Sequence, residues 1–148
     1  MTSNRKLARP LLLIGQIALA AIFLAAGYFK LREPWLQFAV SLSSFKILPD
    51  EWLEPVAKTL PWAEVALGVA ILSGILLRWT ALLSSLILTV FLSVLTRSYL
   101  LGIHADCGCF GSGEPLGPKT LARDSTMLIL ALAVTAGAFL LRKPNRVE

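Results

Sequence analysis

The chain has 148 residues, of which 56% are hydrophobic, with a mean hydropathy of +0.72 and a net charge of +5. This hydropathy excludes an ordinary soluble domain and predicts a single transmembrane domain covering residues 1–148. The excess of basic residues does not indicate a nucleic-acid partner, because most of it flanks the apolar stretches as at the cytoplasmic ends of membrane helices. These flanking residues are Arg5, Lys6, Arg9, Arg142, Lys143 and Arg146.

Four apolar stretches are long enough to cross the lipid bilayer, which takes about 20 helical residues. They cover residues 11–29, 60–77, 79–101 and 121–141. The first could be a cleaved signal peptide, but it exceeds the usual apolar core of about 7–15 residues, so an uncleaved anchor is favoured. Only Arg78 separates the second and third stretches, which predicts a tight hairpin. The expected fold class is all-α, an integral membrane four-helix bundle.

An even number of spans places both termini on one side of the membrane. We expect that side to be cytoplasmic because of the basic termini and Arg78. The loops at residues 30–59 and 102–120 then face outward. Lys and Arg divide seven to seven between the two sides, but the outer ones are interleaved with acidic residues, so the termini decide the orientation.

A short amphipathic helix is predicted inside the first outer loop. Trp35, Phe38, Leu42 and Phe45 recur there at helical intervals, and Pro34 suits the first turn of a helix. Such a helix would lie on the membrane surface. The tryptophans are expected to anchor the protein at the two interfaces, with Trp35, Trp52 and Trp62 outside and Trp79 inside.

Four ionisable residues fall near the outer ends of the spans: Glu64, Arg97, Arg123 and Asp124. Because charges in a bilayer are costly unless paired or hydrated, we expect these residues to face the bundle interior or a wet cavity and to pair. Glu64 and Arg97 are interpreted as supporting groups for cysteine chemistry, through proton transfer and thiolate stabilisation. In the same interpretation Arg123 is an alternative to Arg97 and Asp124 an alternative to Glu64, but for these two residues the favoured role is to hold helices in register. Gln16 is expected to bridge helices.

The chain contains two cysteines, Cys107 and Cys109, in a turn-rich loop with Gly108 between them. Residues this close form a disulfide only if the backbone folds back, which Gly108 permits. The ring would constrain little of the unfolded chain, so a purely structural bond is a poor explanation. Such a small ring is also expected to be strained and easily reduced. Cys107 and Cys109 are therefore interpreted as a redox pair.

Metal binding is the competing interpretation of this loop. The single histidine of the chain, His104, could join Cys107 and Cys109 as a set of soft ligands. The spacing lacks the paired motifs of strong zinc sites, which favours redox chemistry.

Several short motifs point to a known family. They are Gly27-Tyr28-Phe29-Lys30, Leu48-Pro49, Pro61-Trp62-Ala63-Glu64, Leu67-Gly68, Arg123-Asp124 and, most specifically, Cys107-Gly108-Cys109-Phe110-Gly111. In these residues the chain resembles the DoxX-like membrane proteins, and within them the MauE family of methylamine utilisation proteins. The resemblance implies a bacterial inner-membrane protein linked to thiol redox chemistry, with its cysteine loop in the periplasm and a place in methylamine utilisation.

The leading hypothesis is therefore a membrane thiol-disulfide redox protein that acts on a periplasmic thioredoxin-like or disulfide-containing partner. Its electrons need a membrane carrier, and a quinone is suggested by analogy with other four-helix disulfide-forming proteins, although no motif identifies a quinone site. Two alternatives remain open. One is a non-catalytic assembly subunit that docks a partner through the loop, and the other is a metal-handling protein that uses His104, Cys107 and Cys109.

Overall fold

The computed structural model describes residues 2–110 and 113–141, with side chains from residue 7 onward. Within these ranges it contains five helices and, in place of strands, one isolated bridge between Asp106 and Pro115. The helices are α1 (Thr2–Arg32), α2 (Trp35–Ser44), α3 (Asp50–Ser73), α4 (Leu77–Leu100) and α5 (Pro118–Leu141). The predicted all-α fold is confirmed.

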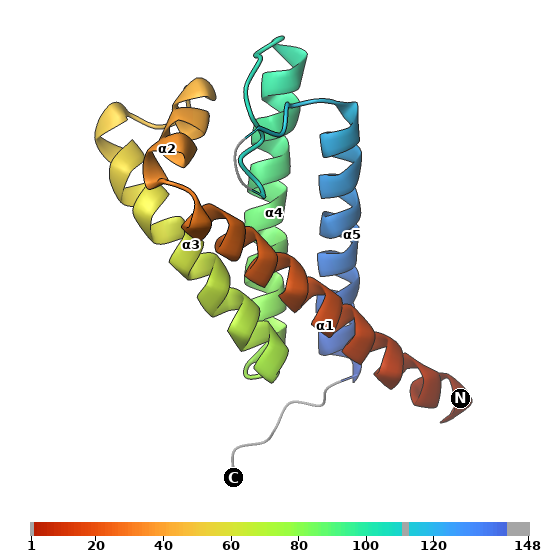
Figure 1. The fold of residues 1–148 in the computed structure, drawn as a ribbon. Coiled ribbons are helices and arrows are strands. Elements are labelled where there is room, and N and C mark those ends of the chain that lie inside the picture. The colour runs from red at the N-terminus through yellow and green to blue at the C-terminus, as the bar shows by residue number, and fades with distance from the viewer. Residues whose placement is uncertain (1, 111–112, 142–148) are drawn as a thin grey trace.

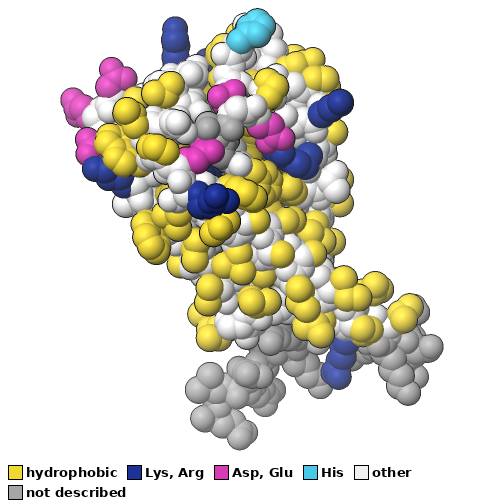
Figure 2. Space-filling model, viewed as in Figure 1, with side chains coloured by type: hydrophobic (Ala, Val, Ile, Leu, Met, Phe, Trp, Pro, Cys, Tyr) yellow, Lys and Arg dark blue, Asp and Glu magenta, His cyan; other side chains and the backbone are white. Residues whose placement is uncertain are grey.

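Four of the helices are long and apolar enough to cross a membrane, namely Leu7–Arg32 of α1 and the full lengths of α3, α4 and α5. Many of their apolar side chains point outward; Leu86, for example, is 60% exposed and Leu140 is 80% exposed. Outward apolar surface of this extent is expected where a helix faces lipid. Figure 2 shows most of the described charged side chains gathered at one end, above a largely apolar body. The chain is a multi-pass membrane protein.

Figure 1 shows α1 running obliquely across the other spanning helices, with α3 on one side and α5 on the other. The loop between α4 and α5 lies at the same end of the molecule as α2. The start of α1 and the end of α5 lie at the opposite end, as an even number of spans requires. Which end faces the cytoplasm stays a prediction. Of the flanking basic residues, Arg9 is exposed, whereas the side chains of Arg5 and Lys6, and residues Arg142, Lys143 and Arg146, lie outside the described part.

Glycines bring α1 and α3 into close contact. A Cβ atom at Gly27 would lie 2.6 Å from Val65 Cγ2 and 2.8 Å from the Pro61 carbonyl oxygen. A Cβ atom at Gly68 would lie 2.8 Å from Leu24 Cγ. Small residues at such contacts let helix backbones approach in lipid, where van der Waals packing drives association. The tilt of α1 against α3 therefore depends on residues without side chains.

Polar side chains tie the helices together at the end away from the loop. Gln16 Nε2 donates a hydrogen bond of 2.7 Å to the carbonyl oxygen of Ile71, which joins α1 to α3 and confirms the predicted bridge. Arg78 Nε donates to the carbonyl oxygen of Ala138 at 3.2 Å, which joins α4 to α5. The same helices share an apolar core formed by Leu19, Ala20, Phe23, Leu67, Ile71, Leu77, Ala81, Ala131, Val134 and Ala138.

The second span begins and ends earlier than the sequence predicted. α3 starts at Asp50, within the predicted outer loop, and stops at Ser73 instead of residue 77. Asp50 and Glu51 favour a helix start because they complement the positive end of the helix dipole. Gly74 ends the helix in the left-handed region at φ 69°, which glycine adopts without a Cβ clash. The hairpin turn is therefore at residues 74–76, and Arg78 lies inside α4.

The predicted amphipathic helix exists as α2, and it packs against α3. Its buried residues are Phe38, Ala39 and Ser41, of which Phe38 and Ala39 form a small cluster with Ala57. Trp35 remains 40% exposed on its outer side. Helix α2 thus has one face on the protein and one available to the membrane surface.

Candidate functional site

The cysteine loop, described at residues 101–110 and 113–117, folds back toward the bundle in these parts. The Cys107 amide donates a 2.8 Å hydrogen bond to the carbonyl oxygen of Glu114, and the Leu116 amide donates one of 2.9 Å to Ala105. These two bonds pair the arms of the loop around its tip. The last glycine of the cysteine motif, Gly111, lies outside the described residues.

Cys107 and Cys109 are joined by a disulfide, with their Cα atoms 5.4 Å apart. Gly108 between them has a φ of 67°, in the left-handed region where glycine carries no steric penalty. The cysteines are buried, with exposed fractions of 1% for Cys107 and 7% for Cys109. They pack with Phe45 and Leu95 in an apolar cluster of their own. The sulfurs therefore lie below the surface of the loop.

Two neighbouring residues of α5 lie against the sulfur atoms with opposite charges. Asp124 Oδ2 is 3.3 Å from Cys109 Sγ and 3.8 Å from Cys107 Sγ. Arg123 Nη2 is 3.8 Å from Cys107 Sγ, and Arg123 Nε donates a 3.1 Å hydrogen bond to Asp124 Oδ1. After reduction, the carboxylate is placed to accept a thiol proton, and the guanidinium to stabilise a thiolate.

The disulfide is covered on its loop side. Phe38 of α2 lies so close to Gly108 that a Cβ atom there would be 3.3 Å from the ring. Arg123 forms an ion pair with Glu114 and lies 4.9 Å from the centroid of the Phe110 ring. Because Arg123 and Glu114 are 29% and 40% exposed, this part of the cover is in contact with solvent. A protein that reaches the sulfurs must move these side chains.

A buried ion pair lies between α1 and α3. Lys30 Nζ is 2.6 Å from Glu64 Oε1, and the two side chains are 5% and 14% exposed. Lys30 Nζ also lies 5.4 Å from the centroid of the Phe38 ring. The second oxygen, Glu64 Oε2, is buried and has no hydrogen-bond partner among the described residues. Glu64 is thus paired inside the bundle as expected, but with a lysine that sequence reasoning had not singled out.

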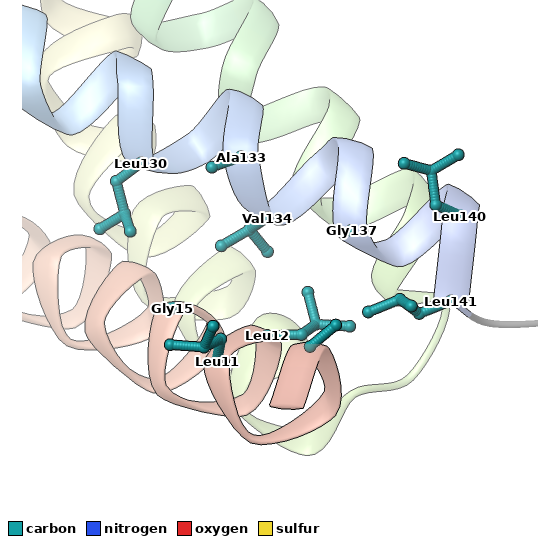
Figure 3. A pocket seen from close by; sticks show the side chains of 10 residues that line it. Leu11, Leu12, Gly15, Leu130, Ala133, Val134, Gly137, Leu140 and Leu141 are labelled. Carbon is teal, nitrogen blue, oxygen red and sulfur yellow. The ribbon is translucent and has the colours of Figure 1, made fainter. Parts of the chain in front are cut away.

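An interior cavity of about 80 Å³ brings these groups together. Its polar wall is formed by Lys30, Glu64, Cys109 and Asp124, and the remaining wall is apolar. A larger groove of about 340 Å³ lies between α1 and α5, as shown in Figure 3. That groove is lined only by Ala, Leu, Val and Gly, so it has no reactive or polar side chains. The small interior cavity is the one that adjoins the sulfurs.

Arg97 and His104 do not join this group, which corrects two expectations. Arg97 is exposed on the last turn of α4, because the interior face of that turn is taken by Leu95 and Ser98. His104 is also exposed, so the ligand set of His104 with the two cysteines is not assembled. Instead, the two sulfurs and an Asp124 oxygen lie within 4.8 Å of one another.

The side chains that the structure places beside the sulfurs and beside Glu64 can each be identified in the sequence. Arg123, the alternative to Arg97 for stabilising a thiolate, is the cation beside sulfur, and Asp124 in place of His104 joins the two sulfurs. Lys30 was part of a recognised motif, and its signal was a single basic residue at the end of an otherwise apolar stretch. The sequence pattern within each helix did not indicate which faces of different helices are in contact.

Comparison with known proteins gives this arrangement a family. The family described as methylamine utilisation protein MauE matches residues 8–137. Two curated relatives bear the name methylamine utilization protein MauE. The protein of Paracoccus denitrificans is 34% identical over 125 residues, which cover 82% of this chain and 67% of that protein. The protein of Methylophilus methylotrophus is 26% identical over 126 residues, which cover 84% and 63%.

The chain thus spans about two thirds of the length of these relatives. No solved structure matches it significantly. The family match includes both cysteines, the Lys30–Glu64 pair and both α5 residues that contact sulfur. Because the match covers most of the chain, the protein belongs to the MauE family.

Proposed function

We propose that this protein is an integral membrane thiol-disulfide redox protein, in which Cys107 and Cys109 alternate between disulfide and dithiol. It supports disulfide formation or maturation of an extracytoplasmic partner protein. Because its relatives are named for methylamine utilisation, the partner belongs to that process in this proposal.

The observation that carries the proposal is the unequal surroundings of the two sulfurs. Asp124 is nearest to Cys109, at 3.3 Å, whereas Arg123 reaches only Cys107, at 3.8 Å. A sulfur that leaves as a thiolate departs faster when a cation lowers its pKa. Attack at Cys109, with Cys107 leaving beside Arg123, is therefore the favoured direction of exchange.

The exchange transfers two electrons and two protons from the partner to the cysteine pair. A partner thiol transfers its proton to Asp124, and the resulting thiolate attacks Cys109 Sγ, breaking the bond to Cys107 and forming a mixed disulfide. The second thiol of the partner then displaces Cys109. The partner loses two electrons and two protons as its own disulfide forms, and Cys107 and Cys109 gain them as a dithiol. For this step Phe110 and Glu114 must move, since both contact Arg123, the side chain beside Cys107 Sγ.

A structural role explains the bond less well. The bonded residues are two positions apart, so the cross-link removes little entropy from the unfolded chain. The surrounding helices are already joined by Gln16 and Arg78 at the far end of the bundle. The Cys107–Cys109 disulfide thus constrains little of the chain, and it lies in contact with two charged side chains, Arg123 and Asp124.

Trapping of mixed disulfides in cells tests this proposal. In the Cys107→Ser variant the exchange runs in reverse: the lone Cys109 thiolate attacks the disulfide of an oxidised partner, breaks it and holds the partner as a mixed disulfide. This adduct should accumulate as a reducible band of higher mass, to be identified by mass spectrometry. The Cys109→Ser variant should give little of this adduct, because Cys107 is not the attacked sulfur. Wild-type function in the variant that lacks both cysteines would contradict the proposal and support a non-catalytic assembly subunit.

We place the cysteine loop in the periplasm of a bacterial inner membrane, with both termini in the cytoplasm. The support is the basic character of the terminal segments. Because the native sulfurs are buried, the orientation is best tested with reporter cysteines in a background that lacks both. An impermeant thiol reagent should label His104→Cys in intact spheroplasts and label Ile75→Cys, in the opposite turn, only after lysis. The reverse pattern would place the loop in the cytoplasm.

Metal binding is the second candidate function, favoured by one observation. The sulfurs of Cys107 and Cys109 and one oxygen of Asp124 lie within 4.8 Å of one another and are buried. Once reduced, they offer two thiolates and a carboxylate, a donor set that suits zinc. Zinc bound stoichiometrically by the reduced protein, and lost in Asp124→Asn but kept in His104→Ala, would support this function over redox exchange.

A further inference from the structure

The cover over the disulfide raises the question of how the cysteine pair is reoxidised. Cys107 and Cys109 are 1% and 7% exposed, and α2, Phe110 and Glu114 lie on their loop side. Cys109 lines the interior cavity as well. Most residues that line that cavity belong to the membrane-spanning helices, so it offers a second approach to this sulfur, from the bilayer side.

The lining of the cavity indicates what kind of molecule suits it. The apolar wall includes side chains from all four spanning helices, among them Ala26, Leu60, Phe91 and Met127. The polar wall holds the Lys30 ammonium, a hydrogen-bond donor, and Glu64, whose Oε2 has no partner in the described part of the chain. Each carboxylate of the wall has a cationic partner: Lys30 pairs with Glu64 inside the cavity, and Arg123, which lies outside the lining, pairs with Asp124. A neutral, apolar molecule with oxygen atoms matches this lining best.

One wall of the cavity is also part of the lipid-facing surface. Ile87 lines the cavity and is 36% exposed on α4, a spanning helix. A molecule dissolved in the bilayer therefore meets the cavity wall without crossing the loop. A water-soluble thiol or oxidant must instead first move the side chains that cover the sulfurs on the loop side.

We propose that this cavity binds a lipid-soluble two-electron acceptor of the quinone class, which reoxidises the Cys107–Cys109 dithiol. This inference rests on the proposed function of the cysteine pair. In the step, the two thiols lose two electrons and two protons and the sulfur-sulfur bond forms. The quinone takes up both electrons and two protons at its carbonyl oxygens and leaves as a quinol. Asp124 accepts the proton from Cys109, and Lys30 donates a hydrogen bond to a carbonyl oxygen.

The cavity must widen to admit a ring. Its volume of about 80 Å³ is smaller than the cavities of about 150 Å³ that bind benzene in engineered proteins. Met127 and Phe110 both line it, and a methionine side chain rearranges at low cost. Phe110 is also part of the cover over Arg123, so movement of this ring changes the cavity and the cover together.

Photo-crosslinking of the full chain in lipid nanodiscs tests the binding site without any redox step. The protein carries Cys107→Ser and Cys109→Ser, and the probe is an azido-quinone, with decylubiquinone as the competitor. We expect competed labels on residues that line the cavity, such as Met127 and Phe91. Ile87→Trp, which fills the lipid-facing wall, should reduce this labelling at least tenfold. The matched control is Leu86→Trp, one position along α4 and 60% exposed, which should leave labelling unchanged.

Gel filtration and circular dichroism check that each variant is folded. Where Ile87→Trp is not, Ala26→Leu fills the cavity from α1, because Ala26 lines it and is 8% exposed. Labels confined to the groove between α1 and α5, labels spread over lipid-facing residues, or equal labelling of the cavity-filling and control variants would each overturn the inference. Specific labelling of the cavity with no trapped protein partner would contradict the proposed exchange but support the quinone site. A trapped partner without specific labelling would support the exchange and contradict the quinone site.

Discussion

The two ends of the bundle are built in different ways. At the end with the α3–α4 turn, the core consists of apolar side chains such as Leu19, Ile71 and Val134, with Gln16 as a buried polar tie to α3. At the loop end, ion pairs, a disulfide and a small cavity are packed together. Figure 2 shows the same contrast on the surface.

The contrast indicates a division between stability and chemistry. Burying a charge is costly even when it is paired, so charged groups are a poor way to hold a membrane bundle together. The apolar end needs only close packing, which its small residues allow. We infer that the apolar end carries most of the stability and the loop end carries the reactive groups.

Removal of the charge at Asp124 should slow thiol-disulfide exchange and leave the fold unchanged. Asp124→Asn keeps the shape but cannot accept a thiol proton, so the rate of oxidation of a short dithiol peptide should fall by about 10²–10⁴-fold. The matched control is Ser125→Ala, which removes a hydroxyl bonded only to its own helix at Leu121. A normal rate in Asp124→Asn would show that the carboxylate at 3.3 Å from Cys109 takes no part in exchange.

Breaking the buried ion pair should cost stability at the loop end. Lys30→Met leaves Glu64 as an unpaired charge, which typically costs about 3–5 kcal/mol of unfolding free energy. Adding Glu64→Gln removes that charge and should restore most of the loss. Unfolding by SDS in mixed micelles measures both. If the double variant is no more stable than Lys30→Met, the pair does not act through charge.

Overpacking between α1 and α3 tests the apolar contact between the helices. In Gly27→Ala the new Cβ meets Val65 Cγ2 at 2.6 Å and a backbone oxygen of Pro61 at 2.8 Å. Such overpacking costs about 1–3 kcal/mol, and the same SDS titration should show it. Gly117→Ala is the control, because its Cβ would meet nothing closer than 4.0 Å. Equal stability of the two variants would mean that the helices can separate at no cost.

The smallest effect is expected at Gln16. Gln16→Leu loses the hydrogen bond to the Ile71 carbonyl, and bonds between membrane helices average about 0.6 kcal/mol in double-mutant cycles. A small fall in unfolding free energy and an unchanged exchange rate are expected. Ser93→Ala, which removes an exposed hydroxyl bonded within α4, serves as the reference. A large loss of exchange in Gln16→Leu would contradict the separation of the two ends.

Length, hydropathy and motif spacing were sufficient to predict the helices, the amphipathic α2 and the pair of cysteines in one loop. The pairing of charges was harder to predict, because Lys30 and Glu64 are 34 residues apart and lie on different helices. In a membrane helix the outward face is also apolar, so hydrophobic periodicity gives little information about which face turns inward. This is why Arg97 was expected inside and proved to be exposed.

The amino-acid sequence by itself determined that the chain spans the membrane several times and carries one pair of cysteines separated by a glycine, because apolar length and local spacing depend on neighbours along the chain. Only the tertiary structure decided that the sulfurs are buried, that Arg123 and Asp124 contact them, and that Lys30 and Glu64 share a cavity with Cys109. Those facts depend on helix rotation and on the close approach at Gly27 and Gly68, which packing between distant segments sets.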